Sequence, residues 1–390
     1  MIQGVGAAAM FGAVVLLGLT LGPQTQGLFS RVKTELEFIS ALSLFGMPQA
    51  VFFFVTSRRM SRASALQVTG LLGCLAVAAS LLYVGLTHSI NALYLAMFAV
   101  AAAAMVVHGM LRVLVLAAST RLFNAVTAAP QVVLLLLVIV SVAIGSLVTW
   151  QVAAIFLLAF LFGSAFAWQA LRANAPHAVD VSTPAAKTKD LTVYGAAAWS
   201  VAVLNSAANV LWLRYIESAL GLAAVGVFTM GLTFVQVILT PINYAVPLLF
   251  KRWVQSPGAA SAAARPALAS GLVTLLVIAP LLAIQGALPM PSALHAYAGL
   301  ADLKWTFAAI AVAEVVVRIA AVGANAAGRP WVPALAELMR LVVLTAAVGM
   351  GFGMLLPSIA TTWACAAAFA ACTVLAVVRL RPDSVKGLPR

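Results

Sequence analysis

The sequence predicts an all-α polytopic membrane protein with about 12 transmembrane helices, arranged in two six-helix bundles. Three observations predict this fold class. Of the 390 residues, 64% are hydrophobic, and the mean hydropathy is +1.11. The apolar residues form about twelve runs, most of them near the ~20 residues that a membrane span needs. Only 8% of the residues are charged, and most of these lie in the short gaps between the runs. A soluble domain of this size has no core that could enclose so much apolar surface.

The apolar runs predict where each span begins and ends. The first run has no basic leading segment and no small-residue cleavage site, so we expect it to be retained as a span. The expected spans are 3–21, 37–56, 63–86, 91–118, 125–145, 150–171, 193–213, 221–250, 267–286, 303–323, 331–354 and 358–378.

Lysines and arginines divide unequally between alternate gaps. Fifteen of the 22 lie in every second gap or in the carboxyl-terminal tail, and only Arg31, Lys33, Arg214 and Lys304 lie in the other gaps. Because basic residues accumulate on the cytoplasmic side of membrane proteins, we expect both termini in the cytoplasm and an even number of spans. This distribution also accounts for the net charge of +13 without a nucleic-acid partner.

A polar stretch rich in Ala, Pro and Thr divides the predicted spans into two sets of six. We expect an amino-terminal bundle at 1–171, a cytoplasmic linker at 172–192, a carboxyl-terminal bundle at 193–380 and a cytoplasmic tail at 381–390. A weak repeat supports this division at a constant offset of 199. It aligns Gly27, Phe29, Ile39 and Pro48 with Gly226, Phe228, Ile238 and Pro247. Such a repeat predicts a pseudo-two-fold axis along the membrane normal, with a site between the halves.

Several functions lack their sequence signature. There is no GxxxxGK[ST] phosphate-binding loop, so the chain is not expected to hydrolyse ATP itself. The three cysteines all fall in predicted spans and the four histidines are scattered. We therefore expect neither a metal site nor a cofactor.

Charged residues within the spans are the candidate functional residues, because a charge in the bilayer core is costly and usually faces a partner or a wet cavity. Glu314 and Arg318 are spaced i,i+4, Glu337 and Arg340 are spaced i,i+3, and Arg112 has no acidic neighbour in its span. In one interpretation the two acid–base pairs are closed and only tie helices together. In the other, the arginines line a cationic cavity, where a planar guanidinium binds phosphate oxygens in two places.

An uncharged polar stripe follows one face of the span at 221–250. Its spacing of 4, 3, 4, 3 places all members on one side of a helix, and two asparagines in the preceding span add to it. Such a stripe either joins helices or forms a hydrophilic wall for a sugar-like cargo. The residues are Thr229, Thr233, Gln236, Thr240 and Asn243, with Asn205 and Asn209 in the preceding span.

The segment from Gly22 to Met60 resembles the first loop and second helix of bacterial polysaccharide flippases of the O-antigen type. These belong to the multidrug/oligosaccharidyl-lipid/polysaccharide exporter superfamily. The matching elements are Gly22-Pro23, Gly27-x-Phe29, Leu44-Phe45-Gly46-x-Pro48 and Arg58-Arg59. The twelve-span layout with a cytoplasmic amino terminus agrees along the whole chain. The chain departs from the family in starting almost directly in its first span.

The resemblance implies a fold and a cargo. The two bundles would form a V around a central cavity in the bacterial inner (cytoplasmic) membrane. The protein would be a monomer that moves a polyprenyl-pyrophosphate-linked oligosaccharide to the periplasmic leaflet, for a polysaccharide polymerase and chain-length regulator to use. Arg112, Arg318 and Arg340 would meet the pyrophosphate, the polar stripe would meet the sugars, and Glu314 or Glu337 would carry a coupling ion.

Two other classes remain open. A cation-coupled drug exporter of the same superfamily would place acids in the first bundle, and the sequence predicts none inside a confident span there. An integral-membrane glycosyltransferase or polymerase would place acids in an outer loop, as at Glu35-x-Glu37. Against the enzyme, Arg31 and Lys33 neutralise that segment, and its acids are also expected of an amphipathic helix start.

Overall fold

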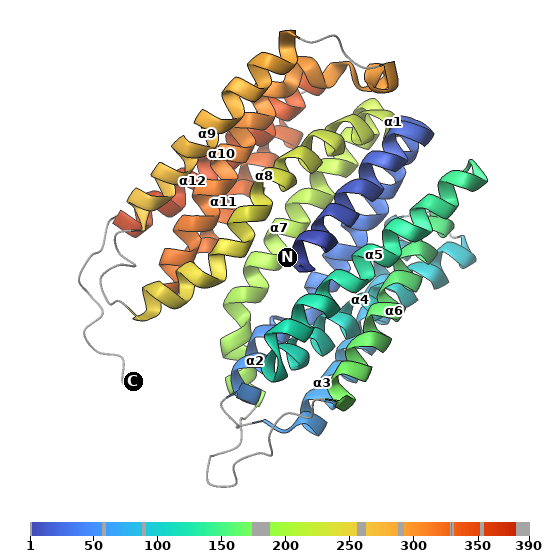
Figure 1. Cartoon of the computed structure of the whole chain (residues 1–390), viewed down its shortest axis with the longest axis vertical. Helices are drawn as coiled ribbons and strands as arrows, with labels where there is room; N and C mark the ends of the chain where they lie inside the picture. Colours follow the sequence, from blue (N-terminus) through green and yellow to red (C-terminus); the bar gives the residue numbers. More distant parts are fainter. Residues whose placement is uncertain are drawn as a thin grey trace. The chain divides into compact units, whose positions relative to one another are not determined.

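The computed structural model describes residues 2–56, 60–87, 91–173, 188–255, 263–287, 292–327, 329, 331–351 and 355–379. Within these ranges the chain forms twelve α-helices and one 3-10 helix, and no strand (Figure 1). The helices are α1 Ile2–Leu44, α2 Met47–Thr56, α3 Arg62–Thr87, α4 Ala92–Ala118, α5 Thr120–Ile144, α6 Thr149–Ala173, α7 Thr188–Leu220, α8 Leu222–Gln255, α9 Ala264–Ala287, η1 Ser292–Tyr297, α10 Gly299–Ala326, α11 Trp331–Gly349 and α12 Leu356–Arg379.

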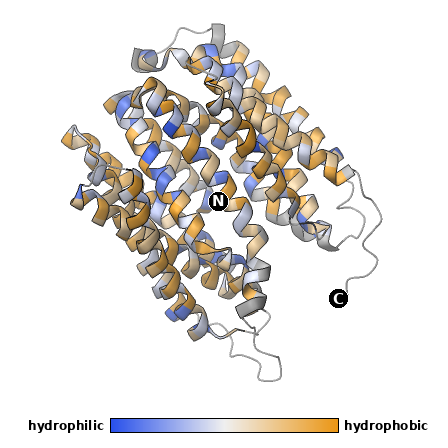
Figure 2. Cartoon of the chain, turned by 180° about the vertical axis from the view of Figure 1, so that it is seen from behind, coloured by the Kyte–Doolittle hydropathy of each residue, from blue (hydrophilic) through white to orange (hydrophobic). Residues whose placement is uncertain are grey.

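Ten of the described helices are long and apolar enough to cross a membrane, with α1 counted once. At 43 residues α1 is about twice as long as one crossing needs, and it contains two passes. The 33-residue α7 is long enough for a further crossing but is less apolar and is not among these ten. Hydrophobic residues run along most of both sets of helices (Figure 2). The predicted all-α class with about twelve spans is confirmed.

The chain divides into two compact units, Met1–Val210 and Leu211–Arg390. One helix occupies the centre of each unit. In the first unit α4 packs against α1, α2, α3, α5 and α6, and in the second α10 packs against α8, α9, α11 and α12. The predicted linker at 172–192 and the tail at 381–390 lie largely outside the described residues, so the predicted domain boundaries stay a prediction.

A single glycine marks each of two helix junctions, one within α1 and one between α7 and α8. Gly22 has φ of 82° inside α1, and Gly221 has φ of 81° between α7 and α8. Glycine adopts this left-handed region at little cost, whereas side chains with a Cβ are strained there. The two glycines are 199 positions apart, the offset of the predicted repeat. In Figure 1 the first pass rises to the label α1 and the chain then returns towards α2.

The structure corrects one predicted gap. Residues 22–36 were expected to form an outer loop before a span at 37–56, but the helix restarts at Pro23 and runs to Leu44. The charges that suggested a loop form i,i+4 pairs along this helix. Arg31 Nε lies 3.9 Å from Glu35 Oε1, and Lys33 Nζ lies 2.7 Å from Glu37 Oε1. Paired charges at this spacing stabilise a helix instead of ending it.

The second pass is broken between α1 and α2. Phe45 and Gly46 both have positive φ, of 47° and 65°. Gly46 packs directly against the backbone of Gly195 in α7, so neither glycine has room for a side chain. Trp199 of α7 covers the break, because its ring stacks on Phe45 at 5.0 Å and its Nε1 donates to the carbonyl of Leu42 at 3.1 Å. The first part of α7 is thereby fixed to the bend in the second pass.

Candidate functional site

Two carboxylates and two guanidiniums form one ionic cluster in the carboxyl-terminal unit. Arg340 of α11 lies between both acids, with Nη2 2.7 Å from Glu314 Oε1 and Nε 3.5 Å from Glu337 Oε2. Arg318 Nε lies 3.9 Å from the other oxygen of Glu314, on the same helix α10. The cluster has no net formal charge when all four groups are ionised. Three helices meet at it, because Arg318 also donates from Nη1 to Asn243 Oδ1 of α8 at 2.5 Å.

The members of the cluster differ in their access to the surroundings. The side chain of Arg340 is 3% exposed, and those of Glu337 and Glu314 are 9% and 12% exposed. The side chain of Arg318 is 31% exposed. In this conformation two carboxylates hold Arg340 inside the unit, and Arg318 is the arginine of the cluster whose side chain is accessible from outside. The predicted pairs Glu314–Arg318 and Glu337–Arg340 are both present, and Arg340 joins them into one cluster.

The polar stripe of α8 leads away from Arg318. Gln236 and Asn243 are exposed, and Thr233 is half-buried. The hydroxyl of Thr233 donates to the carbonyl of Thr229 at 2.7 Å, and that of Thr240 donates to the carbonyl of Gln236 at 2.8 Å. These bonds remain within α8, so the hydroxyl oxygens keep their capacity to accept from a ligand.

The central helix of the amino-terminal unit carries a related pair. His108 of α4 is buried at 3% exposed, and Arg112, one turn further on, is exposed. His108 and Arg112 precede Glu314 and Arg318 by 206 positions each. In each unit the central helix therefore bears an arginine at the accessible position and a titratable residue buried four positions earlier. Among the described residues, no carboxylate lies within ion-pair distance of Arg112.

The remaining predicted residues, Asn205 and Asn209, lie on α7. Both are half-buried, and the side-chain nitrogen of Asn209 donates to the carbonyl of Asn205 at 2.9 Å. The two asparagines are thus on one face of α7. Their role in binding a cargo stays a prediction. Among the described residues there is no group of three or more His, Cys, Asp or Glu side chains placed to hold a metal ion.

The sequence interpretation missed a buried acid in the amino-terminal unit. Glu35 is 1% exposed, and besides its pair with Arg31 it accepts from the hydroxyl of Tyr94 at 3.4 Å. The sequence interpretation placed Glu35 in an outer loop, but the helix extends back to Pro23 and Glu35 is buried on it. The i,i+4 spacing of Arg31 and Glu35 was the sequence signal for this helix. Glu35 is also not an outer-loop acid, which removes the observation that suggested an enzyme.

A scan of protein-family models found no match, and no curated protein matched the sequence. Several solved structures match almost the whole chain. An inward-facing multidrug resistance MATE family transporter of the MOP superfamily has a TM-score of 0.73 at 14% identity, over 97% of this chain and 94% of that one. An outward-facing structure described in the same words has a TM-score of 0.68 at 14% identity, over 100% and 95%. A MATE in its straight conformation has a TM-score of 0.67 at 15% identity, over 98% and 93%.

This likeness shows the fold. The chain has the MATE-like architecture of two six-helix halves. At these identities, what the solved proteins transport does not carry over to this chain.

Proposed function

We propose that this protein is a flippase of the bacterial inner membrane. It moves a polyprenyl-pyrophosphate-linked oligosaccharide from the cytoplasmic to the periplasmic leaflet by alternating access. Solved structures of the same fold exist in inward-facing and outward-facing conformations, which supports alternating access. Both termini are then cytoplasmic, as the distribution of lysine and arginine predicts. A monomer contains both halves and suffices, and the product would serve a polymerase and a chain-length regulator.

The observation that carries the proposal is the partly exposed guanidinium of Arg318 beside an amide. A guanidinium has five N–H donors, and Arg318 uses one in its 2.5 Å bond to Asn243. Its carboxylate neighbour Glu314 is 3.9 Å away and is bound more closely by Arg340. Arg318 therefore has donors left for an incoming phosphate, which it binds in bidentate geometry. Arg112 is a second arginine, exposed as a residue, on the central helix of the amino-terminal unit.

The polar stripe supplies the complementary sugar-binding surface. Gln236 offers a side-chain amide on the same face of α8 as Asn243, which Arg318 contacts. An amide donates and accepts at once, as a sugar hydroxyl does. A phosphate-binding cation next to a row of neutral polar groups suits a lipid-linked sugar better than an apolar or a cationic cargo.

The ionic cluster also provides a means of coupling. When one proton binds to Glu337 or Glu314, the formal charge of the whole cluster changes from zero to +1. The cluster then attracts the pyrophosphate more strongly. Loss of that proton restores neutrality and weakens the attraction. By linkage, cargo binding then favours proton binding to the same extent. Glu314 and Glu337 are the proposed coupling acids.

A leaflet assay tests this function. The full chain is reconstituted in liposomes with a labelled polyprenyl-pyrophosphate oligosaccharide, and the label that reaches the other leaflet is measured. We expect Arg318→Ala to abolish transfer and Arg318→Lys to restore it only in part, since an ammonium keeps the charge but loses the planar fork. Arg214→Ala is the matched control, because Arg214 is 29% exposed and lies 3.9 Å from Glu217 on α7. Full transfer by Arg318→Ala would refute the proposed role of Arg318.

A drug exporter is the second candidate, and buried Glu35 is the observation that favours it. A carboxylate enclosed in the amino-terminal unit suits a proton- or cation-coupled antiporter, and the solved structures of this fold include proteins described as multidrug resistance transporters. The same liposomes distinguish the two functions. Efflux of a cationic dye that is lost in Glu35→Gln, without transfer of any lipid-linked sugar, would replace the flippase with the exporter.

A further inference from the structure

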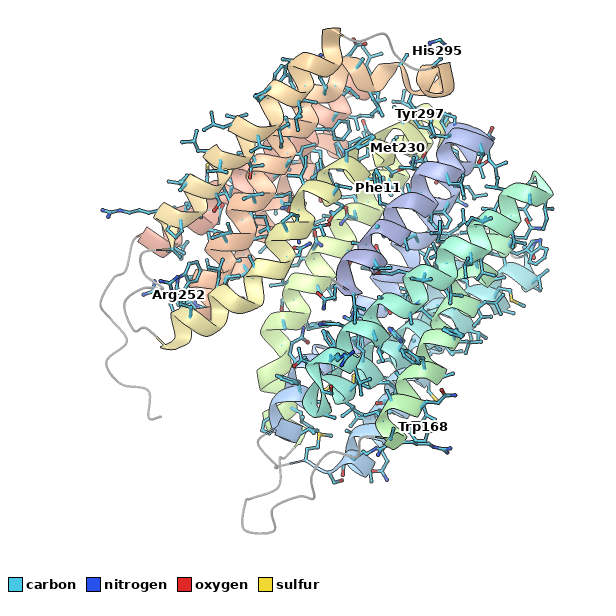
Figure 3. All side chains as sticks on the ribbon, in the orientation of Figure 1. Phe11, Trp168, Met230, Arg252, His295 and Tyr297 are labelled. Carbon is cyan, nitrogen blue, oxygen red and sulfur yellow. The ribbon has the colours of Figure 1, made fainter. Side chains whose placement is uncertain are left out.

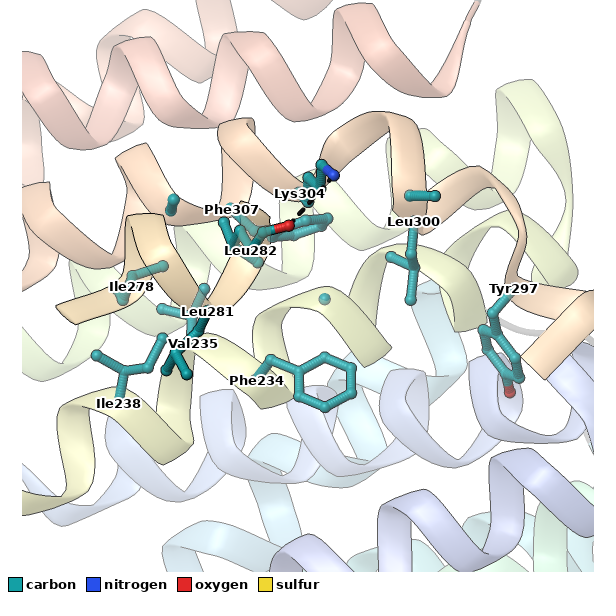
Figure 4. A pocket seen from close by; sticks show the side chains of 13 residues that line it. Phe234, Val235, Ile238, Ile278, Leu281, Leu282, Tyr297, Leu300, Lys304 and Phe307 are labelled. Carbon is teal, nitrogen blue, oxygen red and sulfur yellow. Dashed lines mark hydrogen bonds between the residues drawn. The ribbon is translucent and has the colours of Figure 1, made fainter. Parts of the chain in front are cut away.

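An apolar cavity lies within the carboxyl-terminal unit, towards the end of the helices where Lys304 is found. Its volume is about 390 Å³, and residues of α8, α9, η1 and α10 line it (Figure 4). Its walls are almost entirely hydrocarbon. They include Val235, Ile238, Ile278, Leu281 and Phe307.

This cavity is separate from the proposed sugar-binding stripe. At 3.6 residues per turn, Val235 and Ile238 lie on the face of α8 opposite to Thr233, Gln236 and Thr240. The same segment of α8 therefore presents neutral polar groups on one side and hydrocarbon on the other. On α10 the cavity residues run from Leu300 to Ala308, so the nearest of them is six residues, or about 9 Å along the helix, before Glu314.

Lys304 is the charged member of the described residues that line the cavity. Its Nζ donates to the carbonyl of Leu282 at 3.4 Å, which leaves two of the three ammonium donors for another acceptor. No acidic side chain is among the lining residues, and the exposed Asp302 is two positions away on a different face of α10. The cavity thus combines hydrocarbon walls with one cation that lacks a carboxylate partner in its lining.

Tyr297 of η1 adds a second polar group to the cavity. The tyrosine is 1% exposed, and burial raises its pKa to about 12. It keeps its phenol proton at physiological pH and adds no charge that would oppose an anion. Figure 3 places Tyr297 near η1 at one end of the unit, and Figure 4 shows Lys304 and Tyr297 both at the cavity wall.

We propose that this cavity binds the hydrocarbon chain of an isoprenoid phosphate, and that the ammonium of Lys304 binds the phosphate group. A volume near the lower end of the ~300–1,000 Å³ range of ligand pockets suits a segment of one chain better than the two chains of a phospholipid. The choice of an isoprenoid rests on the proposed flippase function. On the predicted orientation, Lys304 lies at the periplasmic end, so the site would hold the lipid part of the cargo on the release side.

Binding of defined lipids to the purified full chain tests the proposal. The probes are geranylgeranyl phosphate, the uncharged geranylgeraniol and phosphatidylglycerol, and native mass spectrometry in detergent counts the bound copies. We expect one copy of the isoprenyl phosphate, and Lys304→Gln should weaken it by about tenfold while leaving the alcohol unchanged. Tenfold corresponds to the loss of one charge-assisted hydrogen bond.

Variants that fill the cavity distinguish binding inside it from nonspecific binding of lipid to the hydrophobic surface of the protein. Ala301→Phe and Ala308→Phe place a ring in the cavity from two turns of α10 and should weaken both isoprenoids. Leu272→Phe is the matched control, because Leu272 is 58% exposed on α9 and does not line the cavity. Circular dichroism and the unfolding temperature show which variants are folded. Because two positions are tested, one variant remains informative if the other does not fold.

Three outcomes would overturn the proposal: no bound isoprenyl phosphate, unchanged affinity in folded filling variants, or equal displacement by phosphatidylglycerol. Failure of the flippase is a different result. In that case the leaflet assay detects no transfer although Lys304-dependent isoprenoid binding persists, which supports the cavity and refutes the function.

Discussion

The buried position of Arg340 makes a quantitative prediction about the ionic cluster. Replacing Arg340 by leucine removes the cation that lies 2.7 Å from Glu314 and 3.5 Å from Glu337. Both carboxylates then remain inside the unit without their closest counter-charge. Replacing Arg318 by leucine removes a guanidinium that is 31% exposed and only 3.9 Å from Glu314. The two substitutions delete the same group from the same cluster at different depths.

The expected costs follow from this difference. Breaking a buried ion pair by removal of one partner costs about 3–5 kcal/mol, whereas a partly exposed pair contributes about 0–1 kcal/mol because solvent screens it. In a domain of this size each kcal/mol shifts the unfolding temperature by about 2–4 °C. We therefore expect Arg340→Leu to lower the unfolding temperature by about 10 °C, and Arg318→Leu by no more than about 4 °C.

Thermal unfolding of the purified variants, followed by circular dichroism in one detergent, measures both shifts. Adding Glu314→Gln to Arg340→Leu removes one of the stranded charges and should recover part of the loss. Equal shifts for the two arginine variants would refute the burial argument. So would a double variant that is less stable than Arg340→Leu alone.

Three further predictions concern the helix junctions and η1. Gly221→Ala should lower the unfolding temperature, because a left-handed residue with a Cβ costs about 1–2 kcal/mol, whereas Gly4→Ala in open space should not. Trp199→Phe keeps the stacking on the bend but loses the bond to Leu42, so thermal unfolding should show a loss of about 1 kcal/mol. Tyr297 holds its phenol proton more tightly in the folded protein, so its contribution to folding stability is present below pH 10 and is lost as pH rises towards 12. The unfolding temperature of Tyr297→Phe should therefore fall less steeply between pH 10 and pH 12 than that of the unchanged protein.

Much of the fold could be predicted because span length and charge placement are local properties of the sequence. From α3 to α12 the ends of the helices lie within five residues of the predicted span ends, apart from the carboxyl end of α7, which lies seven residues further on. The gap at 22–36 was mispredicted because its charges were counted singly. Their i,i+4 pairing, and the contact of Glu35 with Tyr94, allow them to remain in a helix.

The ionic cluster could be predicted only within each helix. The spacing of Glu314 and Arg318 follows from the helical repeat. The shorter contact of Glu314 with Arg340 depends on how α10 and α11 pack, which no single-helix pattern contains. The equivalence of Arg112 and Arg318 was also missed, because it appears only once α4 and α10 are known to be the central helices of their units.

The one-residue junctions at Gly22 and Gly221 limit how each opening pair of helices moves. Consecutive Cα atoms are held about 3.8 Å apart, so at this end the two passes have no slack and cannot slide apart. The two helical segments can therefore change the angle between them only by bending at the junction, and the displacement is largest at their far ends. The two junctions are 199 residues apart, so a single kind of bending is available twice in one chain.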